Sequence, residues 1–112
     1  MAARRPKRIQ RKRVKGWHMP PNTIYVGRPT AFGNPYRLEF YRFEDASGRP
    51  TKHVASAREM AVRDFRMWLG VNPQGEIIAA RAKRELRGKN LACWCRPGQP
   101  CHADVLLEIA NG

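Results

Sequence analysis

The chain has 112 residues, of which 42% are hydrophobic, and this is enough for one hydrophobic core but too little for two. Its longest apolar run, residues 91–95, is far too short to cross a bilayer, so no membrane partner is expected. The formal net charge of +13 favours a polyanionic partner. Three cysteines cannot all pair within one chain, which argues for reduced thiols and a cytoplasmic protein.

The N-terminal segment carries much of the positive charge. Eight basic residues precede residue 16, and no acid occurs before Asn22; the eight are Arg4, Arg5, Lys7, Arg8, Arg11, Lys12, Arg13 and Lys15. Each of them can release counterions from a phosphate, so we expect them to bind nucleic acid. Because the segment has no apolar period, we predict that residues 1–22 form a basic, largely disordered arm. A solvated tail without a specific partner is the alternative.

Residues 23–112 are expected to form a single domain that begins with a strand. Residues 23–26 are β-branched and aromatic and stop at Gly27, which predicts a buried strand. A loop dense in turn residues follows over residues 27–36. Weak alternation around residues 45–48 suggests a hairpin between residues 38 and 54.

Three helices and a second strand are expected after the hairpin. A capping box at Ser56 opens the first helix, which Gly70 should end, and Asn72 with Pro73 opens the second. Residues 90–95 are small and apolar on both faces, which predicts a strand covered on both sides. The last helix should start near Cys101. Strands joined through helices run parallel, so we predict a small three-layer α/β domain with a short, mainly parallel sheet.

The concentrated chemistry of the sequence lies in Cys93, Cys95, Cys101 and His102. A period of two places Cys93 and Cys95 on one face of the strand, and Cys101 can return toward them across a five-residue turn. A helix N-terminus favours a thiolate or a bound anion. We therefore predict a catalytic site with Cys101 as the nucleophile, His102 as its acid or base, and Cys93 beside them.

A substrate phosphate is expected to bind next to these residues, because ligands of open parallel sheets bind beyond the carboxyl ends of the strands. The loop after the first strand and the turn after residue 95 leave the sheet at that edge. The residues expected to hold the phosphate are Arg28, Thr30, Asn34 and Arg96.

Two other interpretations of the Cys/His group stay open. Cys93, Cys95, Cys101 and His102 complete a tetrahedral zinc shell by count, although zinc ligand pairs normally sit about two to four residues apart. The cysteines can also be small apolar residues that fill a buried strand. Zinc is therefore the cofactor that the metal-site interpretation implies, whereas the catalytic-site interpretation implies no cofactor.

Two pairs of motifs make the chain resemble known families. They read IYVGRPT with GNPY over residues 24–36, and LACWC with QPCHADVLL over residues 91–107. From about residue 15 to the end, the chain resembles the small bacterial and phage proteins of domain of unknown function 4326, a family without an established reaction. Cys93 and the Cys101-His102 pair are also similar to domain of unknown function 488, although Ala103 replaces the arginine of that motif. The second resemblance implies a strand, turn and helix site.

These observations predict a nucleotide- or nucleic-acid-processing protein. In this hypothesis a thiol-dependent enzyme acts on a nucleotide or phosphorylated ligand between residues 28–34 and 95–102. The first alternative is a zinc-stabilised, non-catalytic nucleic-acid-binding module, and the second is a phage-type host-interaction protein without a reaction. The choice between DNA and RNA and the oligomeric state have no signal in the sequence.

Overall fold

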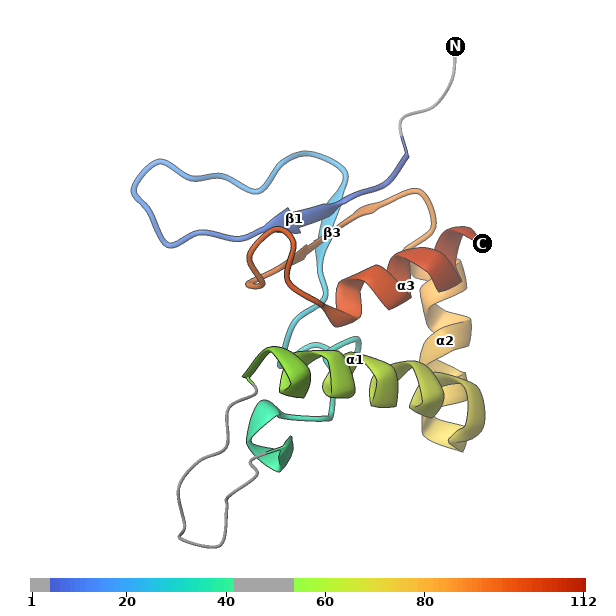
Figure 1. Cartoon of the computed structure of the whole chain (residues 1–112). Helices are drawn as coiled ribbons and strands as arrows, with labels where there is room; N and C mark the ends of the chain where they lie inside the picture. The colour runs from blue at the N-terminus through green and yellow to red at the C-terminus, as the bar shows by residue number, and fades with distance from the viewer. Residues whose placement is uncertain (1–4, 42–53) are drawn as a thin grey trace, which may run out of the picture.

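The computed structural model describes residues 5–41 and 54–112. Within them the chain forms three short strands, three α-helices and one 3-10 helix (Figure 1). In chain order these elements are β1 (Arg8–Gln10), β2 (Thr23–Tyr25), η1 (Leu38–Tyr41), α1 (Val54–Val71), α2 (Pro73–Glu85), β3 (Asn90–Cys93) and α3 (His102–Asn111).

The strands form a parallel sheet in the order β1-β3-β2. Leu91 of β3 lies opposite Arg8 on one side and Ile24 on the other. The central place of β3 agrees with its composition, because Leu91, Ala92 and Cys93 are at most 1% exposed. The expected small α/β domain with a short parallel sheet and three helices is confirmed.

Strand β1 corrects one expectation from the sequence. Residues 1–22 were expected to form a largely disordered arm, and this is wrong for Arg8–Gln10, which pair with β3. The backbone N–H of Leu91 donates to the Lys7 carbonyl at 3.0 Å, and that of Arg11 donates to the Cys93 carbonyl at 2.7 Å. An edge strand needs mainly backbone partners and tolerates charged side chains, so a hydrophobic period was not required.

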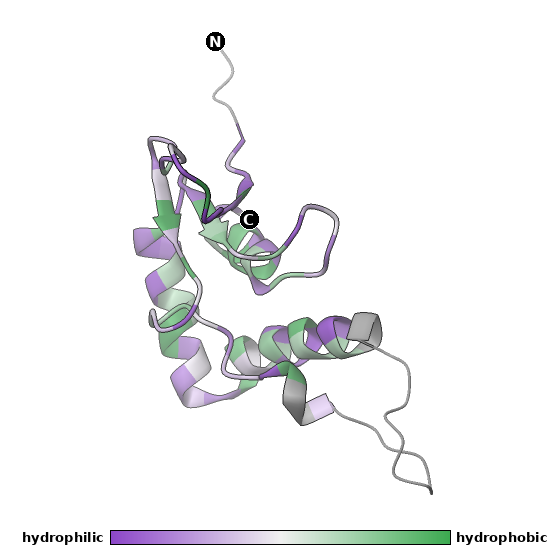
Figure 2. Cartoon of the chain, turned by 90° about the vertical axis from the view of Figure 1, so that its left-hand side faces the viewer, coloured by the Kyte–Doolittle hydropathy of each residue, from purple (hydrophilic) through white to green (hydrophobic). Residues whose placement is uncertain are grey.

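The last helix of the chain, α3, packs directly on the sheet. Helix α3 contacts β3 and β1 and lies between the sheet and α1, while α2 packs against both other helices (Figure 1). Phe65 of α1 and Leu106 of α3 are fully buried in the shared core. Apolar and polar bands alternate along α1, as expected of a helix that buries one face (Figure 2).

Sequence signals placed the helix boundaries with mixed success. The Asn72 side chain accepts a hydrogen bond from the Gln74 N–H at 2.9 Å, which confirms it as the N-cap of α2. Helix α1 instead begins at Val54, two residues before the capping box at Ser56, and continues through Gly70 to Val71. Position Ser56 is therefore inside the helix.

The expected hairpin of residues 38–54 lies mostly outside the described residues, since residues 42–53 are not among them. Its first residues, Leu38–Tyr41, form η1 rather than a strand. In the described part of the chain, no helix combines the length and the apolar character that crossing a bilayer would take.

Candidate functional site

Three cysteine side chains meet at the C-terminal end of β3. Cys93 ends this strand, Cys95 lies two residues beyond it, and Cys101 directly precedes α3. Their Sγ atoms all lie within 4.8 Å of one another, and those of Cys93 and Cys101 are 3.4 Å apart. All three are free thiols, with Cys95 less buried than the other two. The structure thus brings together the cysteines that the sequence singled out.

The interactions within this thiol cluster shift the pKa values of its members in opposite directions. Bonds from Cys101 and Cys93 hold the pKa of Cys95 well below its usual range, although burial acts in the opposite direction. Bonds with Cys93 and Cys95, together with burial, raise the pKa of Cys101. For Cys93 the bond with Cys101 lowers the pKa, but the bond with Cys95 and burial outweigh it, so the pKa is raised. The geometry therefore favours a thiolate on Cys95 that two neutral thiols stabilise.

His102 is fixed beside the thiols by a backbone contact. Its Nε2 lies 2.8 Å from the Val26 carbonyl oxygen, and its Nδ1 lies 3.8 Å from the Sγ of Cys101. Burial is the main cause that lowers the pKa of His102, so the ring is neutral near pH 7. Because a carbonyl oxygen can only accept, Nε2 carries the proton and Nδ1 presents a lone pair to Cys101.

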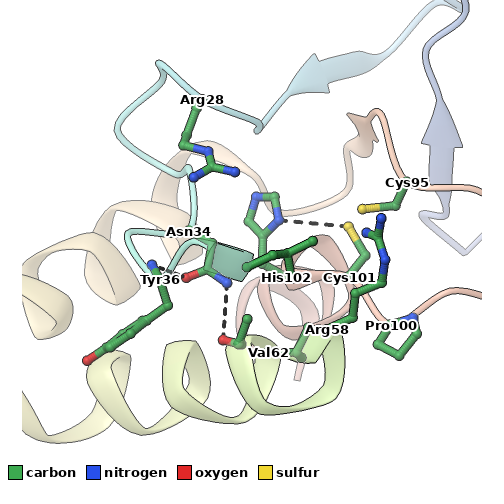
Figure 3. Close-up of a pocket in the computed structure, with 11 residues that line it drawn as sticks. Arg28, Asn34, Tyr36, Arg58, Val62, Cys95, Pro100, Cys101 and His102 are labelled. Carbon is green, nitrogen blue, oxygen red and sulfur yellow. Dashed lines mark hydrogen bonds between the residues drawn. The ribbon is translucent and has the colours of Figure 1, made fainter. Parts of the chain in front are cut away.

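Two adjoining pockets open beside the cluster, with volumes of about 110 Å³ and 310 Å³. They share Arg28, Asn34, Cys95 and His102 in their walls. Figure 3 shows the smaller pocket, with Cys95, Cys101 and His102 on one side and Arg28 on the other. The loop after β2 and the turn after β3 form its opposite walls, because parallel strands end at one edge of the sheet.

The charged residues in the walls of both pockets are arginines. Arg28 lines both pockets, Arg58 of α1 lines the smaller one, and no carboxylate is among the described residues that line either. In Figure 3 the Arg58 guanidinium extends to the vicinity of Cys95. Sequence reasoning missed Arg58, since it lies far from both motifs and only the packing of α1 beneath the loop places it here. Two cations without a neutralising acid make the pockets suited to an anion.

The other residues expected at a substrate phosphate have different places. Asn34 lines both pockets, but its Nδ2 donates to the Ala61 carbonyl at 3.1 Å and its Oδ1 accepts from the Tyr36 N–H at 2.9 Å. Thr30 donates its hydroxyl to the Gly27 carbonyl at 2.6 Å and closes a turn. Neither Thr30 nor Arg96 lines the pockets. Only Arg28 of this group therefore has a charged side chain at the site.

The seven described basic residues of the N-terminal segment divide into three kinds, and the eighth is not described. Arg4 lies outside the described residues. The Arg8 side chain is only 13% exposed and donates to the carbonyls of Arg96 and Gln99 and to Asp104, so it holds the turn after β3. Arg11 and Arg13 stack on aromatic rings. The remaining four are exposed, namely Arg5, Lys7, Lys12 and Lys15.

Comparison with known proteins gives one match. A family model described as "Domain of unknown function (DUF4326)" matches residues 9–112, which include both pocket walls, the thiol cluster and most of β1. No curated protein matches the chain. No solved structure matches it either.

Proposed function

Because the chain belongs to the family of domain of unknown function 4326, whose name assigns no activity, we propose a function from the site itself. The protein acts on a nucleotide or another phosphorylated ligand, with Cys95 as the attacking thiolate. One observation carries this proposal. The sulfur with the lowered pKa lines both pockets, and the charged groups that share these walls are arginines.

The residues around Cys95 supply complementary roles. Arg28 and Arg58 bind the phosphate and neutralise its charge, as guanidinium groups do in other phosphate sites. The neighbouring thiols of Cys101 and Cys93 lower the pKa of Cys95 and so favour its ionised form. The lone pair of His102 Nδ1 faces Cys101 and is unprotonated in the resting protein, so it can take up a proton that is released during the reaction. Cys95 then attacks an electrophilic atom of the bound ligand, and the leaving group departs with the bonding electrons.

This proposal differs in one respect from the expectation that Cys101 is the nucleophile. Cys101 is 2% exposed, and its neighbours raise its pKa, so its thiol stays protonated. It therefore suits the role of a hydrogen-bond donor better than that of an attacking group. Cys95 is the more accessible of the two. Cys95 is accessible because it lies just beyond the end of β3, whereas Cys101 lies at the start of α3.

A nucleotide panel tests the proposal. Nucleoside mono-, di- and triphosphates are added to the protein, binding is followed by isothermal titration, and products are identified by mass spectrometry. Cys95→Ser should abolish turnover and leave binding within a few-fold of the original, whereas the double variant Arg28→Gln/Arg58→Gln should lose binding. Lys83→Gln/Arg84→Gln, at exposed positions on α2, is the control for loss of two charges. Failure of every phosphorylated ligand to bind would reject the proposal.

A structural zinc site is the second candidate. Three Sγ atoms lie within 4.8 Å of one another and match three of the four ligands of a zinc shell, and the nitrogen of His102 that faces them, Nδ1, lies 3.8 Å from the Sγ of Cys101. The Val26 carbonyl that orients His102 through its other nitrogen is the usual outer partner of a ligating histidine.

Metal content separates the two candidates. Protein purified without added metal is analysed for zinc, and its thiols are labelled before and after chelation. One zinc per chain, with thiols that react only after chelation, would favour the non-catalytic module. Cys95→Ser should then lower the thermal midpoint strongly, because zinc binding and folding are coupled. Metal-free protein with a reactive Cys95 favours the thiolate.

A further inference from the structure

A row of stacked side chains lies outside the thiol cluster, and no part of the proposed reaction uses it. The Arg11 guanidinium carbon lies 4.5 Å from the centroid of the Tyr25 ring and 4.8 Å from that of Trp94, and the Arg13 guanidinium carbon also lies 4.8 Å from the Trp94 centroid. We call these four side chains the Trp94 ladder. Their contacts alternate between cations and aromatic rings, so the ladder is a continuous surface rather than scattered charges.

The sheet holds the ladder in place. Arg11 follows β1, Trp94 follows β3, and Tyr25 ends β2, so the three parallel strands each contribute a member at the same edge. Trp94 Nε1 donates to the Tyr25 hydroxyl oxygen at 3.1 Å, and that hydroxyl donates to the Arg28 carbonyl at 2.8 Å. The ladder therefore joins the loop that carries Arg28 and has a fixed position beside the pockets.

The two arginines of the ladder keep their donors available. Among the described residues, no hydrogen bond or ion pair occupies either guanidinium, and the Nε atom of Arg11 is buried without a partner. A guanidinium stacked on a ring still presents its N–H groups outward in its own plane. The first acid in the sequence is Glu39, so no carboxylate from the N-terminal segment competes for them. Unpaired donors of this kind point to an anionic ligand that lies across the ladder.

Continuity with the larger pocket identifies that ligand. Tyr25 and Trp94 line the 310 Å³ pocket together with Cys95 and His102. Trp94 is 39% exposed, so part of the indole is accessible from solvent beside the two arginines. A ligand that follows the ladder would bring one of its units into the pocket, with phosphates on the arginines and a ring against the indole.

We propose that the Trp94 ladder binds a single-stranded nucleic acid and guides one of its nucleotides toward Cys95. This inference rests on the proposed function, since it names the polymer that carries the phosphorylated unit. Alternating cations and aromatic rings bind single strands because each base offers a face for stacking and each linkage offers a phosphate. A duplex keeps its bases stacked on one another and offers no free ring to Trp94 or to a pocket of this size.

Anisotropy titrations of the full chain test the proposal. The probes are short fluorescein-labelled oligo-dT and oligo-U, with a duplex of the same length, at three salt concentrations. The double variant Arg11→Gln/Arg13→Gln should bind single strands at least tenfold more weakly and flatten the plot of log affinity against log salt by about 1.4, since each phosphate contributes about 0.7. Trp94→Ala should weaken single-strand binding by about tenfold. The DNA and RNA probes show which sugar the ladder prefers.

The matched control is Lys83→Gln/Arg84→Gln, which removes the same charge from exposed positions on α2. It should leave the affinity within about threefold, and equal losses in both double variants would overturn the proposal in favour of general charge attraction. Tighter binding of the duplex than of either single strand would overturn it as well. Circular dichroism and thermal melts confirm that each variant is folded.

The ladder and the pocket can fail independently. Arg11→Gln/Arg13→Gln should keep the affinity for a mononucleotide, because neither arginine lines the pockets. Mononucleotide binding with no oligonucleotide binding would therefore reject the ladder and keep the proposed function. Oligonucleotide binding that depends on the ladder, without any reaction of a nucleotide, would keep the ladder and reject the enzyme.

Discussion

The Nε2 atom of His102 lies 2.8 Å from the carbonyl oxygen of Val26, across 76 residues of sequence. This contact joins the start of α3 to the residue that follows β2. It fixes the ring so that Nδ1 faces the Sγ of Cys101 at 3.8 Å. One hydrogen bond thus sets both the orientation and the tautomer of the His102 ring beside the thiols.

The tautomer of His102 is a testable consequence. Burial lowers its pKa, and the Val26 carbonyl requires a donor, so we expect a neutral ring protonated at Nε2 near pH 7. Long-range nitrogen–proton correlation spectra distinguish this form from the Nδ1 tautomer and from the charged ring. His102→Gln assigns the signals. A signal with the proton on Nδ1 would contradict the geometry of the cluster.

Alkylation should mark the cysteines in a definite order. Because bonds from Cys101 and Cys93 lower the pKa of Cys95 and raise that of Cys101, iodoacetamide should react first at Cys95. The rate at Cys95 should stay nearly constant as the pH falls from neutral, since its thiolate persists there. Mass spectrometry of briefly labelled protein gives the order, and Cys95→Ser removes the fast phase. A fast phase on Cys101 would return the nucleophile to the position that the sequence favoured.

The sequence predicted the thiol cluster because its members are close along the chain. A strand period of two and a short turn are local rules, and they bring Cys93, Cys95 and Cys101 to one place without knowledge of the rest. Arg58 lies in a separate helix, so only tertiary packing puts it beside them. The pKa order of the thiols likewise depends on distances between sulfurs, which spacing does not give.

Strand β1 shows a different limit. Its residues Arg8–Gln10 carry one apolar side chain between polar neighbours, and pattern rules look for burial of one face. The strand is held instead by backbone pairing and by the Arg8 side chain, whose partners lie about ninety residues away. A charge run of this kind is indistinguishable from a solvated tail until those partners are placed. The Asn72 cap was predicted correctly because all its partners are within three residues.

Arg8 should matter for stability rather than for ligand binding. Its guanidinium donates to the Gln99 carbonyl at 2.7 Å and to Asp104 at 2.9 Å. In Arg8→Ala these two acceptors lose their hydrogen-bond donor. We expect the free energy of unfolding to fall by about 1–3 kcal/mol in urea titrations. Lys12→Ala removes the same charge from an exposed position and should change stability by less than about 0.5 kcal/mol. Equal stability of the two variants would show that Arg8 does not hold the turn.

Because of Tyr41, the free energy of unfolding should depend on pH in the alkaline range. Burial and the hydrogen bond from its hydroxyl to Asp64 raise the pKa of Tyr41 from 10.0 to about 12. The unfolded chain therefore loses this proton at lower pH than the folded chain, and the contribution is complete below pH 10.0 and is lost as the pH rises toward 12. Tyr41→Phe should lack this loss. Urea midpoints of both proteins at pH 8, 10 and 11 measure it, and parallel curves would contradict the raised pKa.

Two glycines should respond in opposite directions to the same substitution. A Cβ on Gly75 would overlap the carbonyl oxygen of Trp68 and lie 2.6 Å from its carbonyl carbon, because α2 crosses α1 with no space between the backbones. Gly75→Ala must push the helices apart and should cost about 1–3 kcal/mol. A Cβ on Gly70 meets nothing within 4 Å, and this glycine lies inside α1 without a positive φ.

Gly70→Ala should therefore stabilise the protein by about 0.5–1 kcal/mol, because alanine loses less backbone freedom than glycine on entering a helix. Thermal and urea unfolding of both variants beside the unmodified chain give the two signs from one type of experiment. The same added methyl group serves as its own chemical control, so only the local packing differs. Stabilisation by Gly75→Ala would show that α1 and α2 do not cross at this glycine.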